Sequence, residues 1–302
     1  MHVAMEWGLI SGGIALIRLW DHPAATVLGA LWIGARQHAL LALAHEAAHG
    51  RLLRPWLRSA SRDASTLRRS IVELMEEALT AWPLLASARS YRRVHMAHHR
   101  HLGTPRDPDW ARNRPDRWGE PAPAASRIRH LLGLQASQRG LLAMFVGGAA
   151  SSSSAARQAD LQWMLARVAF YVGAALVITQ LRAWPLAFEY WFLPLLLWTT
   201  VLMRLRGISE HWAIPTIRHG IETRTLLLSP LGRLLFLPKN MGYHLEHHLY
   251  PGVPFQRLPE LHRALQAVPG HAERAHTTRG IPALVAEVAS FRRAAPSVQE
   301  DA

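Results

Sequence analysis

Four long apolar segments constrain the fold of this chain more than any other feature. They cover residues 3–20, 24–44, 162–181 and 186–203. A helix that crosses a membrane needs about 20 mostly apolar residues, so each segment is long enough to span. Within each pair, only a short break separates the two members: Asp21-His22-Pro23 in the first and Arg182-Ala183-Trp184-Pro185 in the second. We therefore expect an all-α integral membrane protein with four transmembrane helices in two hairpins.

Charge is distributed unevenly around these segments. Between Gly50 and Gly140 there are 17 Arg and 8 acidic residues, whereas the two breaks carry only Asp21 and Arg182. Loops rich in Arg and Lys stay on the cytoplasmic side of a membrane. This predicts one domain over residues 1–302, with both termini in the cytoplasm and a cytoplasmic helical cap of residues 45–161 and 204–292. The tail 293–302 is expected to be frayed.

Composition excludes several other classes of protein. Half of the residues are hydrophobic and 18% are charged, below the quarter or so that is usual for soluble domains. The net charge is +13, and the Arg residues that carry it lie between the apolar segments. This distribution argues against a nucleic-acid partner and for contact with a membrane surface. Because the chain has no Cys and 18 His, imidazole is its best ligand for a transition metal.

The basic middle of the chain shows two further patterns. Apolar residues recur at helical spacing over Ile71–Arg93, which predicts one amphipathic helix at the membrane interface. Arg, Pro and Asp dominate Arg112–Pro123, which predicts a loop.

Histidine is concentrated in three clusters. They are His45 with His49; His95 with His98 and His99; and His244 with His247 and His248. In a helix, residues at positions i, i+3 and i+4 lie within about 100° of arc. Each cluster therefore presents its imidazoles on one helix face, as a metal site requires.

These clusters contain too many imidazoles for one metal ion. A zinc ion takes about four ligands, so eight imidazoles predict two ions, and all-imidazole ligation favours iron, copper or zinc. The orientation above puts all three clusters on the cytoplasmic side. His211 follows the fourth span at the same depth and is a ninth candidate ligand, while His38 and His101 stay open.

Two other kinds of metal-binding protein are alternatives. His45, Glu46 and His49 match the HExxH signature of zinc proteases, in which the Glu activates water. An intramembrane protease is thus an alternative, although it leaves two clusters unused. A passive metal transporter is less consistent, because its ligands should follow a transmembrane path.

Beyond the clusters, longer stretches of the sequence resemble the membrane fatty acid desaturase and hydroxylase superfamily. That family has one HxxxH or HxxxxH box and two HxxHH boxes, which His45–His49, His95–His99 and His244–His248 match. The continuations HHRHLGTPRDPD at 98–109 and NMGYHLEHHLYPGVPFQRLP at 240–259 are similar to those of bacterial acyl desaturases. RGISEH at 206–211 is similar to the segment that supplies an additional histidine there.

The resemblance implies four transmembrane helices and a cytoplasmic cap that holds two irons, with O2 as co-substrate. It implies nine metal ligands: His45, His49, His95, His98, His99, His211, His244, His247 and His248. Asp107, Asp109 and Glu210 would accept the distal N–H of ligand imidazoles. For the Asp pair a capped turn is an equal alternative. Asn240 would hold a metal-bound water or cap a turn.

The resemblance also implies a function: hydrogen abstraction from an alkyl chain, most simply the desaturation of a fatty acyl substrate. Hydroxylation or ketolation of a fatty acyl, carotenoid or hydrocarbon substrate is the alternative within the superfamily. The substrate would come on a lipid or an acyl carrier. No haem-binding His-Pro-Gly-Gly segment is present, so a separate electron donor such as a ferredoxin or a cytochrome b5 is expected. A bacterial inner membrane is the expected location.

Overall fold

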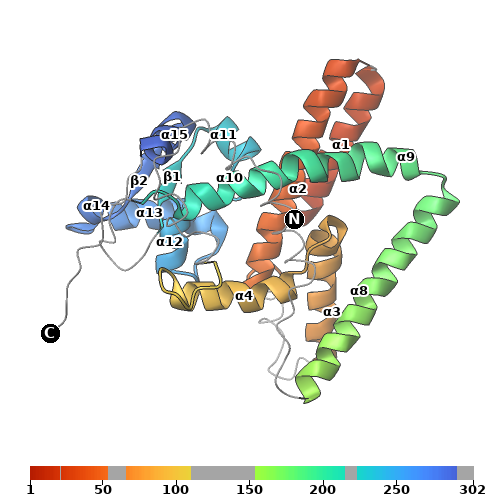
Figure 1. Ribbon diagram of the computed structural model, residues 1–302, viewed down its shortest axis with the longest axis horizontal. Coiled ribbons are helices and arrows are strands. Elements are labelled where there is room, and N and C mark those ends of the chain that lie inside the picture. Colours follow the sequence, from red (N-terminus) through yellow and green to blue (C-terminus); the bar gives the residue numbers. More distant parts are fainter. Residues whose placement is uncertain (21, 54–65, 110–153, 215–222, 291–302) are drawn as a thin grey trace.

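The computed structural model describes residues 1–20, 22–53, 66–109, 154–214 and 223–290, most of which are helical (Figure 1). The predictions for Asp21, the loop 112–123 and the tail 293–302 lie outside these residues. Four helical segments are long and apolar enough to cross a membrane: His2–Trp20, Pro23–Ala48, Asp160–Gln180 and Trp184–His211. They contain nearly all of the four apolar segments predicted from the sequence.

Helix α2 (Pro23–Ala48) is the central helix of the fold, and α1 (His2–Trp20) packs along it. The side chain of His22 accepts a hydrogen bond from the Ala24 amide at 3.1 Å and so caps the start of α2, while Pro23 suits the first helical turn. Almost every residue from Ile33 to Ala48 is buried. Burial on all sides places the first histidine cluster inside the protein.

A buried ion cluster explains the acidic residue in the first apolar segment. Glu6 is fully buried. Its carboxylate lies 3.1 Å from Arg36 Nη1 and 2.5 Å from the Nζ of Lys239, the single Lys of the chain. Charges leave water only when they are paired. Glu6 therefore ties α1 to α2 and to the segment that precedes the third histidine cluster.

The fourth apolar segment is helical but irregular. It consists of α9 (Trp184–Ala187), the two π-helical turns η5 (Phe188–Phe192) and η6 (Leu195–Thr199), and α10 (Thr200–His211). π-Helical turns leave some backbone carbonyls without a partner in the helix. Inside a membrane, these carbonyls need hydrogen-bond donors from elsewhere in the protein. Gln37 of α2 donates to the Trp191 carbonyl at 2.9 Å and accepts from Thr199 Oγ1 at 2.7 Å.

The second predicted pair of spans is joined by a short turn but opens widely. Helix α8 (Ser154–Gln180) and the segment formed by α9 and α10 diverge from this turn like the arms of a V (Figure 1). No residue of the apolar window of α8 is buried inside the protein. The surroundings of α8 are therefore expected to be lipid.

The prediction of a single helix over Ile71–Arg93 is wrong, because the structure has several shorter helical elements there. This part of the chain folds into α3 (Thr66–Glu76), a π-helical turn η2 (Glu77–Ala81), a 3₁₀ turn η3 (Trp82–Leu84) and α4 (Ala88–His101). The break has a local cause, because Pro83 cannot continue a helix and Leu85 takes a left-handed φ of 61°. The Ser87 hydroxyl then caps α4 by accepting from the Ser90 amide at 3.2 Å.

The C-terminal part surrounds a short sheet that the all-α prediction did not include. Strands β1 (Thr225–Leu227) and β2 (Thr277–Arg279) pair in parallel, with Thr225 opposite Thr277. Three-residue strands are too short to show an alternating pattern in the sequence. The helical elements around them are α11 (Pro230–Leu235), α12 (His244–Leu249), η7 (Phe255–Arg257), α13 (Leu258–Gln266), α14 (His271–Arg274) and α15 (Gly280–Ser290).

A glycine lets α12 approach this sheet. The Gly242 carbonyl accepts from the Leu226 amide at 2.7 Å. A Cβ at Gly242 would lie 2.4 Å from the Leu226 carbonyl oxygen, which is closer than atoms can pack. Only glycine therefore fits here, and the contact fixes the start of the helix that carries the third cluster.

Candidate metal centre

Nine histidines come together in two groups. The five-histidine group consists of His45, His49, His95, His99 and His247, and the four-histidine group consists of His98, His211, His244 and His248. Within each group, one ring nitrogen from every residue lies within 4.8 Å of all the others. These are the nine residues singled out in the sequence, and the fold gathers them from four separate elements.

Each HxxHH box is divided between the two groups. Helix α4 gives His95 and His99 to the five-histidine group and His98 to the other. Helix α12 does the reverse, since only His247 enters the five-histidine group. The C-terminal end of α2 supplies the first cluster and the end of α10 supplies His211. The divided boxes hold the two groups side by side.

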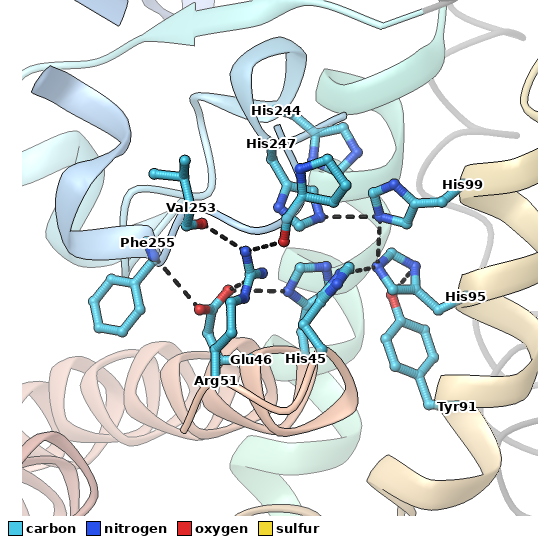
Figure 2. Close-up of polar contacts among 12 residues, drawn as sticks. His45, Glu46, Arg51, Tyr91, His95, His99, His244, His247, Val253 and Phe255 are labelled. Atoms are coloured by element: carbon cyan, nitrogen blue, oxygen red, sulfur yellow. Dashed lines mark hydrogen bonds and ion pairs between the residues drawn. The ribbon is translucent and has the colours of Figure 1, made fainter. Parts of the chain in front are cut away.

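In the five-histidine group, ring nitrogens approach one another closely (Figure 2). His95 Nε2 lies 2.8 Å from His49 Nε2 and 3.0 Å from His99 Nε2. His99 Nε2 also lies 3.1 Å from His247 Nε2. A hydrogen bond joins one N–H donor to one lone-pair acceptor. Three or more ring nitrogens that point at one another therefore cannot all be paired by hydrogen bonds.

The four-histidine group repeats this arrangement. His244 Nε2 lies 3.0 Å from His211 Nε2 and 3.1 Å from His248 Nε2. The His98 ring packs against those of His211 and His248, with centroids 4.8 Å and 5.1 Å away. Both groups therefore turn their Nε2 atoms inward.

Carboxylates fix the ring of His98 from behind. Its Nδ1 lies 2.9 Å from Asp107 Oδ1, and both side chains are buried. A proton on Nδ1 that is donated to Asp107 leaves the Nε2 lone pair free for a metal. Asp109 is farther away, with an oxygen 3.9 Å from His98 Nδ1. Its amide donates to Asp107 at 2.8 Å. Asp107 therefore contacts a ligand imidazole and also caps a turn, while a hydrogen bond from an imidazole to Asp109 stays a prediction.

Glu210 and Asn240 have different surroundings. Glu210 Oε1 accepts from Arg206 Nε at 2.6 Å and lies 3.4 Å from His244 Nδ1. The side-chain amide of Asn240 donates to the Phe255 carbonyl at 3.0 Å, and its backbone is left-handed with φ 56°. This contact favours the turn role of Asn240, while a metal-bound water there stays a prediction.

Burial favours the neutral form of several imidazoles of the site. Loss of hydration, followed by the neighbouring imidazoles, lowers the pKa of His95, His244, His247 and His248 well below the usual value. Burial also lowers the pKa of His99 to about 4. Although burial by itself raises the pKa of Asp107, hydrogen bonds from His98 and the Asp109 amide lower it overall. Neutral rings keep the lone pairs that a metal binds.

These features fit two metal ions. Among the described residues, neither ring nitrogen of His45 has a hydrogen-bond partner, although the side chain is buried. An unpaired buried polar group is costly, and a cation at the centre of each group would satisfy the inward-facing lone pairs together. A donor set of neutral imidazoles suits iron, copper or zinc.

Several polar residues around the groups were not predicted from the sequence. The Tyr91 hydroxyl lies 3.1 Å from His95 Nδ1 and can orient that ring as Asp107 orients His98. Glu246, inside the third box, accepts from Thr225 Oγ1 and lies 2.6 Å from His262 Nδ1, so it anchors α12 to β1 and α13. Tyr91 stands four residues before His95, and this helical spacing was the available signal.

Two histidines that the sequence left open lie outside both groups. His38 is fully buried in α2, seven residues before His45. His101 ends α4 and is partly exposed. Neither belongs to a set of converging ring nitrogens among the described residues.

Comparison with known proteins places the chain in a family. The family model described as fatty acid desaturase matches residues 21–280, and the chain belongs to this family. The dihydrorhizobitoxine desaturase of Bradyrhizobium elkanii is 24% identical over 93% of this chain and 79% of its own length. A beta-carotene ketolase of Paracoccus sp. (strain N81106 / MBIC 01143) is 29% identical over 86% of this chain and 85% of its own length.

A second beta-carotene ketolase, from Paracoccus sp. (strain PC1), is 29% identical over 79% of each chain. The names of all three relatives describe oxidoreductases, which supports oxidoreductase as the class of this enzyme. Together with the four apolar helices, the family indicates a membrane protein. The resemblance inferred from the histidine boxes is thereby confirmed.

Proposed function

We propose that this chain is an O2-dependent desaturase that uses two irons to introduce a double bond into the alkyl chain of a fatty acyl substrate. The single observation that carries the proposal is the convergence of nine imidazoles into two adjacent groups. When bound, the irons would supply the activation of O2 and the removal of hydrogen from an unactivated carbon.

The residues of the chain would hold and orient these metals. The five-histidine and four-histidine groups would each bind one iron through inward-facing Nε2 atoms. Asp107 behind His98 and Tyr91 behind His95 would fix the ring orientations. Such partners of ligand imidazoles typically change metal affinity by about 10- to 100-fold.

A second candidate function is the ketolation or hydroxylation of a carotenoid, hydrocarbon or fatty acyl substrate. It is supported by the two relatives named beta-carotene ketolase, which match most of this chain. The same metal centre would serve either outcome, so the product distinguishes the two functions.

The contacts of Glu46 argue against a zinc protease. A protease of the HExxH type needs its Glu free to activate a metal-bound water. Here the Glu46 carboxylate pairs with Arg51 at 2.9 Å and accepts from the Phe255 amide at 3.4 Å. Both oxygens of Glu46 are therefore engaged by Arg51 and Phe255, and Oε1 also lies 3.6 Å from His45 Nδ1.

The membrane arrangement belongs to the same proposal. We infer two membrane hairpins in a bacterial inner membrane, with the termini and the metal centre on the cytoplasmic side. The supporting feature is the Arg-rich sequence between Gly50 and Gly140. A separate ferredoxin or cytochrome b5-like protein would deliver electrons to this side. The acyl substrate would reach the same side on a lipid or a carrier protein.

Metal content and product analysis test the function together. Detergent-purified protein should contain about two irons per chain, one for each histidine group. Cells that express the wild type should accumulate lipids with new double bonds, while cells that express the His247→Ala variant should not. This variant should also contain less iron, because it loses a ligand of the five-histidine group.

Other results would point to other functions. New carbonyl or hydroxyl groups would replace the desaturase with a ketolase or hydroxylase. One zinc and no iron would favour the protease. Full activity with full iron in the His247→Ala variant would contradict the ligand assignment.

A further inference from the structure

A buried ion pair lies beside the five-histidine group, on the side away from the inward-facing nitrogens (Figure 2). Glu46 stands in α2 between His45 and His49, and Arg51 follows the end of this helix. Their side chains are 3% and 10% exposed, and Arg51 Nη2 lies 2.9 Å from Glu46 Oε1. At this depth the pair is screened little by water, unlike a surface salt bridge.

Arg51 also reaches the segment that follows the third box. Its Nη1 donates to the Val253 carbonyl at 2.5 Å and to the Pro251 carbonyl. In the opposite direction, the Phe255 amide donates to Glu46 Oε2 at 3.4 Å. The planar guanidinium can make these contacts at once because its donors point in several fixed directions.

The two chain segments joined in this way both supply the five-histidine group. The first box contributes His45 and His49, and the third box contributes His247. The four-histidine group takes no residue from the first box. The position of the first box relative to α12 therefore bears directly on the five-histidine group alone, because α12 carries ligands of both groups and the first box carries ligands of one.

We infer that Glu46 and Arg51 form a clamp that positions the first box against the third and so sets the metal affinity of the five-histidine group. Glu46 is then a positioning residue rather than a base. The inference rests on the proposed metal centre, but it is independent of the substrate and of the reaction.

Variants that each lose one ligand make the test specific. His211→Ala leaves three imidazoles in the four-histidine group and should weaken it, and His49→Ala leaves four in the five-histidine group and should weaken it. In metal-free protein, titration with Co2+ alone then gives a binding step for each group, and the step that His211→Ala or His49→Ala leaves unchanged belongs to the intact group. We expect Glu46→Ala to lower Co2+ affinity about 10- to 100-fold in the His211→Ala protein and to change it little in the His49→Ala protein.

Two further variants separate positioning from loss of folding. Glu46→Gln keeps an acceptor for the Phe255 amide but removes the ion pair, so its affinity should fall between those of the wild type and Glu46→Ala. Arg51→Lys keeps the charge, but an ammonium group cannot contact Glu46 and two carbonyls at once. Its Co2+ affinity should therefore fall nearly as far as that of Glu46→Ala. Combining Glu46→Gln with Arg51→Gln should cost no more than the larger single loss, because the two residues act through each other.

Three outcomes would overturn the inference. Unchanged Co2+ affinity in the His211→Ala background would show that the clamp does not act on the metal. Equal losses in both backgrounds would show a general effect on folding. If the wild type bound no Co2+, no iron and no zinc, the proposed metal centre would fail, and this inference with it.

Discussion

At the scale of single residues, the site depends on which ring nitrogen of each histidine carries its proton. Asp107 behind His98 and Tyr91 behind His95 are the contacts that set this choice. Their effect is directional, since a ring held from the Nδ1 side points Nε2 into its group. Behind the rings of the four-histidine group lie the carboxylates of Asp107 and Glu210. Behind those of the five-histidine group lie the Tyr91 hydroxyl and the Glu46 carboxylate, which is 3.6 Å from His45 Nδ1.

Asp107 offers a test with a matched neighbour. Asp107→Asn removes the negative charge behind His98, and we expect the affinity of the four-histidine group to fall about 10- to 100-fold. Asp109→Asn changes a carboxylate that is 3.9 Å from the same nitrogen, so its loss should be much smaller. Co2+ titration of the His49→Ala protein measures both. Equal losses for the two variants would contradict the role of Asp107.

The lowered pKa of His99 predicts how the metal-free protein responds to acid. The folded state keeps His99 neutral down to about pH 4, whereas the unfolded chain takes up a proton below about pH 6.5. The unfolded state therefore binds more protons in this window, and the free energy of unfolding falls as pH drops through it.

Unfolding of metal-free protein in detergent, followed across this pH range, measures the effect. His99→Gln should reduce the slope. A stability that is the same at both ends of the window would contradict the predicted shift.

At the scale of secondary-structure elements, α4 is held at its start by a buried carboxylate. Glu77 of the π-helical turn η2 accepts from the Ser87 hydroxyl at 3.0 Å and from the amides of Ala88 and Arg89 at 3.1 Å and 2.7 Å. The first amides of a helix have no partner within it. Burial raises the pKa of Glu77, and these hydrogen bonds oppose that rise.

Removing this carboxylate should loosen the helix that carries the second box. We expect Glu77→Ala to cost about 2 kcal/mol in the free energy of unfolding, since several buried donors lose their acceptor. Glu73 of α3 is a suitable control, because it is partly exposed and faces Arg89 at 3.5 Å. Glu73→Ala should cost at most about 1 kcal/mol. Chemical unfolding in detergent compares the two, and equal costs would contradict the capping role.

At the scale of the whole molecule, the proposed orientation follows from charge. The chain has no Cys, so single cysteines can report the side of the membrane without background. Arg182→Cys lies at the turn before α9, and Gln266→Cys lies at the end of α13. A membrane-impermeant maleimide should label the first from outside the cell and the second only in inverted vesicles. Labelling of both from the same side would contradict the proposed topology.

The amino-acid sequence by itself determined the four apolar helices and the nine histidines that converge. Both are local properties: a span needs only length and hydrophobicity, and a box needs only helical spacing. The resemblance also implied that Asp107 accepts from a ligand imidazole, and the structure pairs it with His98. By contrast, the apolar periodicity over Ile71–Arg93 predicts a continuous helix and does not reveal the break at Pro83 and Leu85.

Only the tertiary structure decided how the histidines are shared. Residues at i, i+3 and i+4 lie so close on a helix that either metal could take any of them. The division of each box depends on how α4 and α12 cross α2, which no local pattern encodes. The same holds for Glu46 and Arg51, whose partners lie about 200 residues away in the chain. Contacts at such separation arise from packing, and packing is fixed by the whole molecule at once.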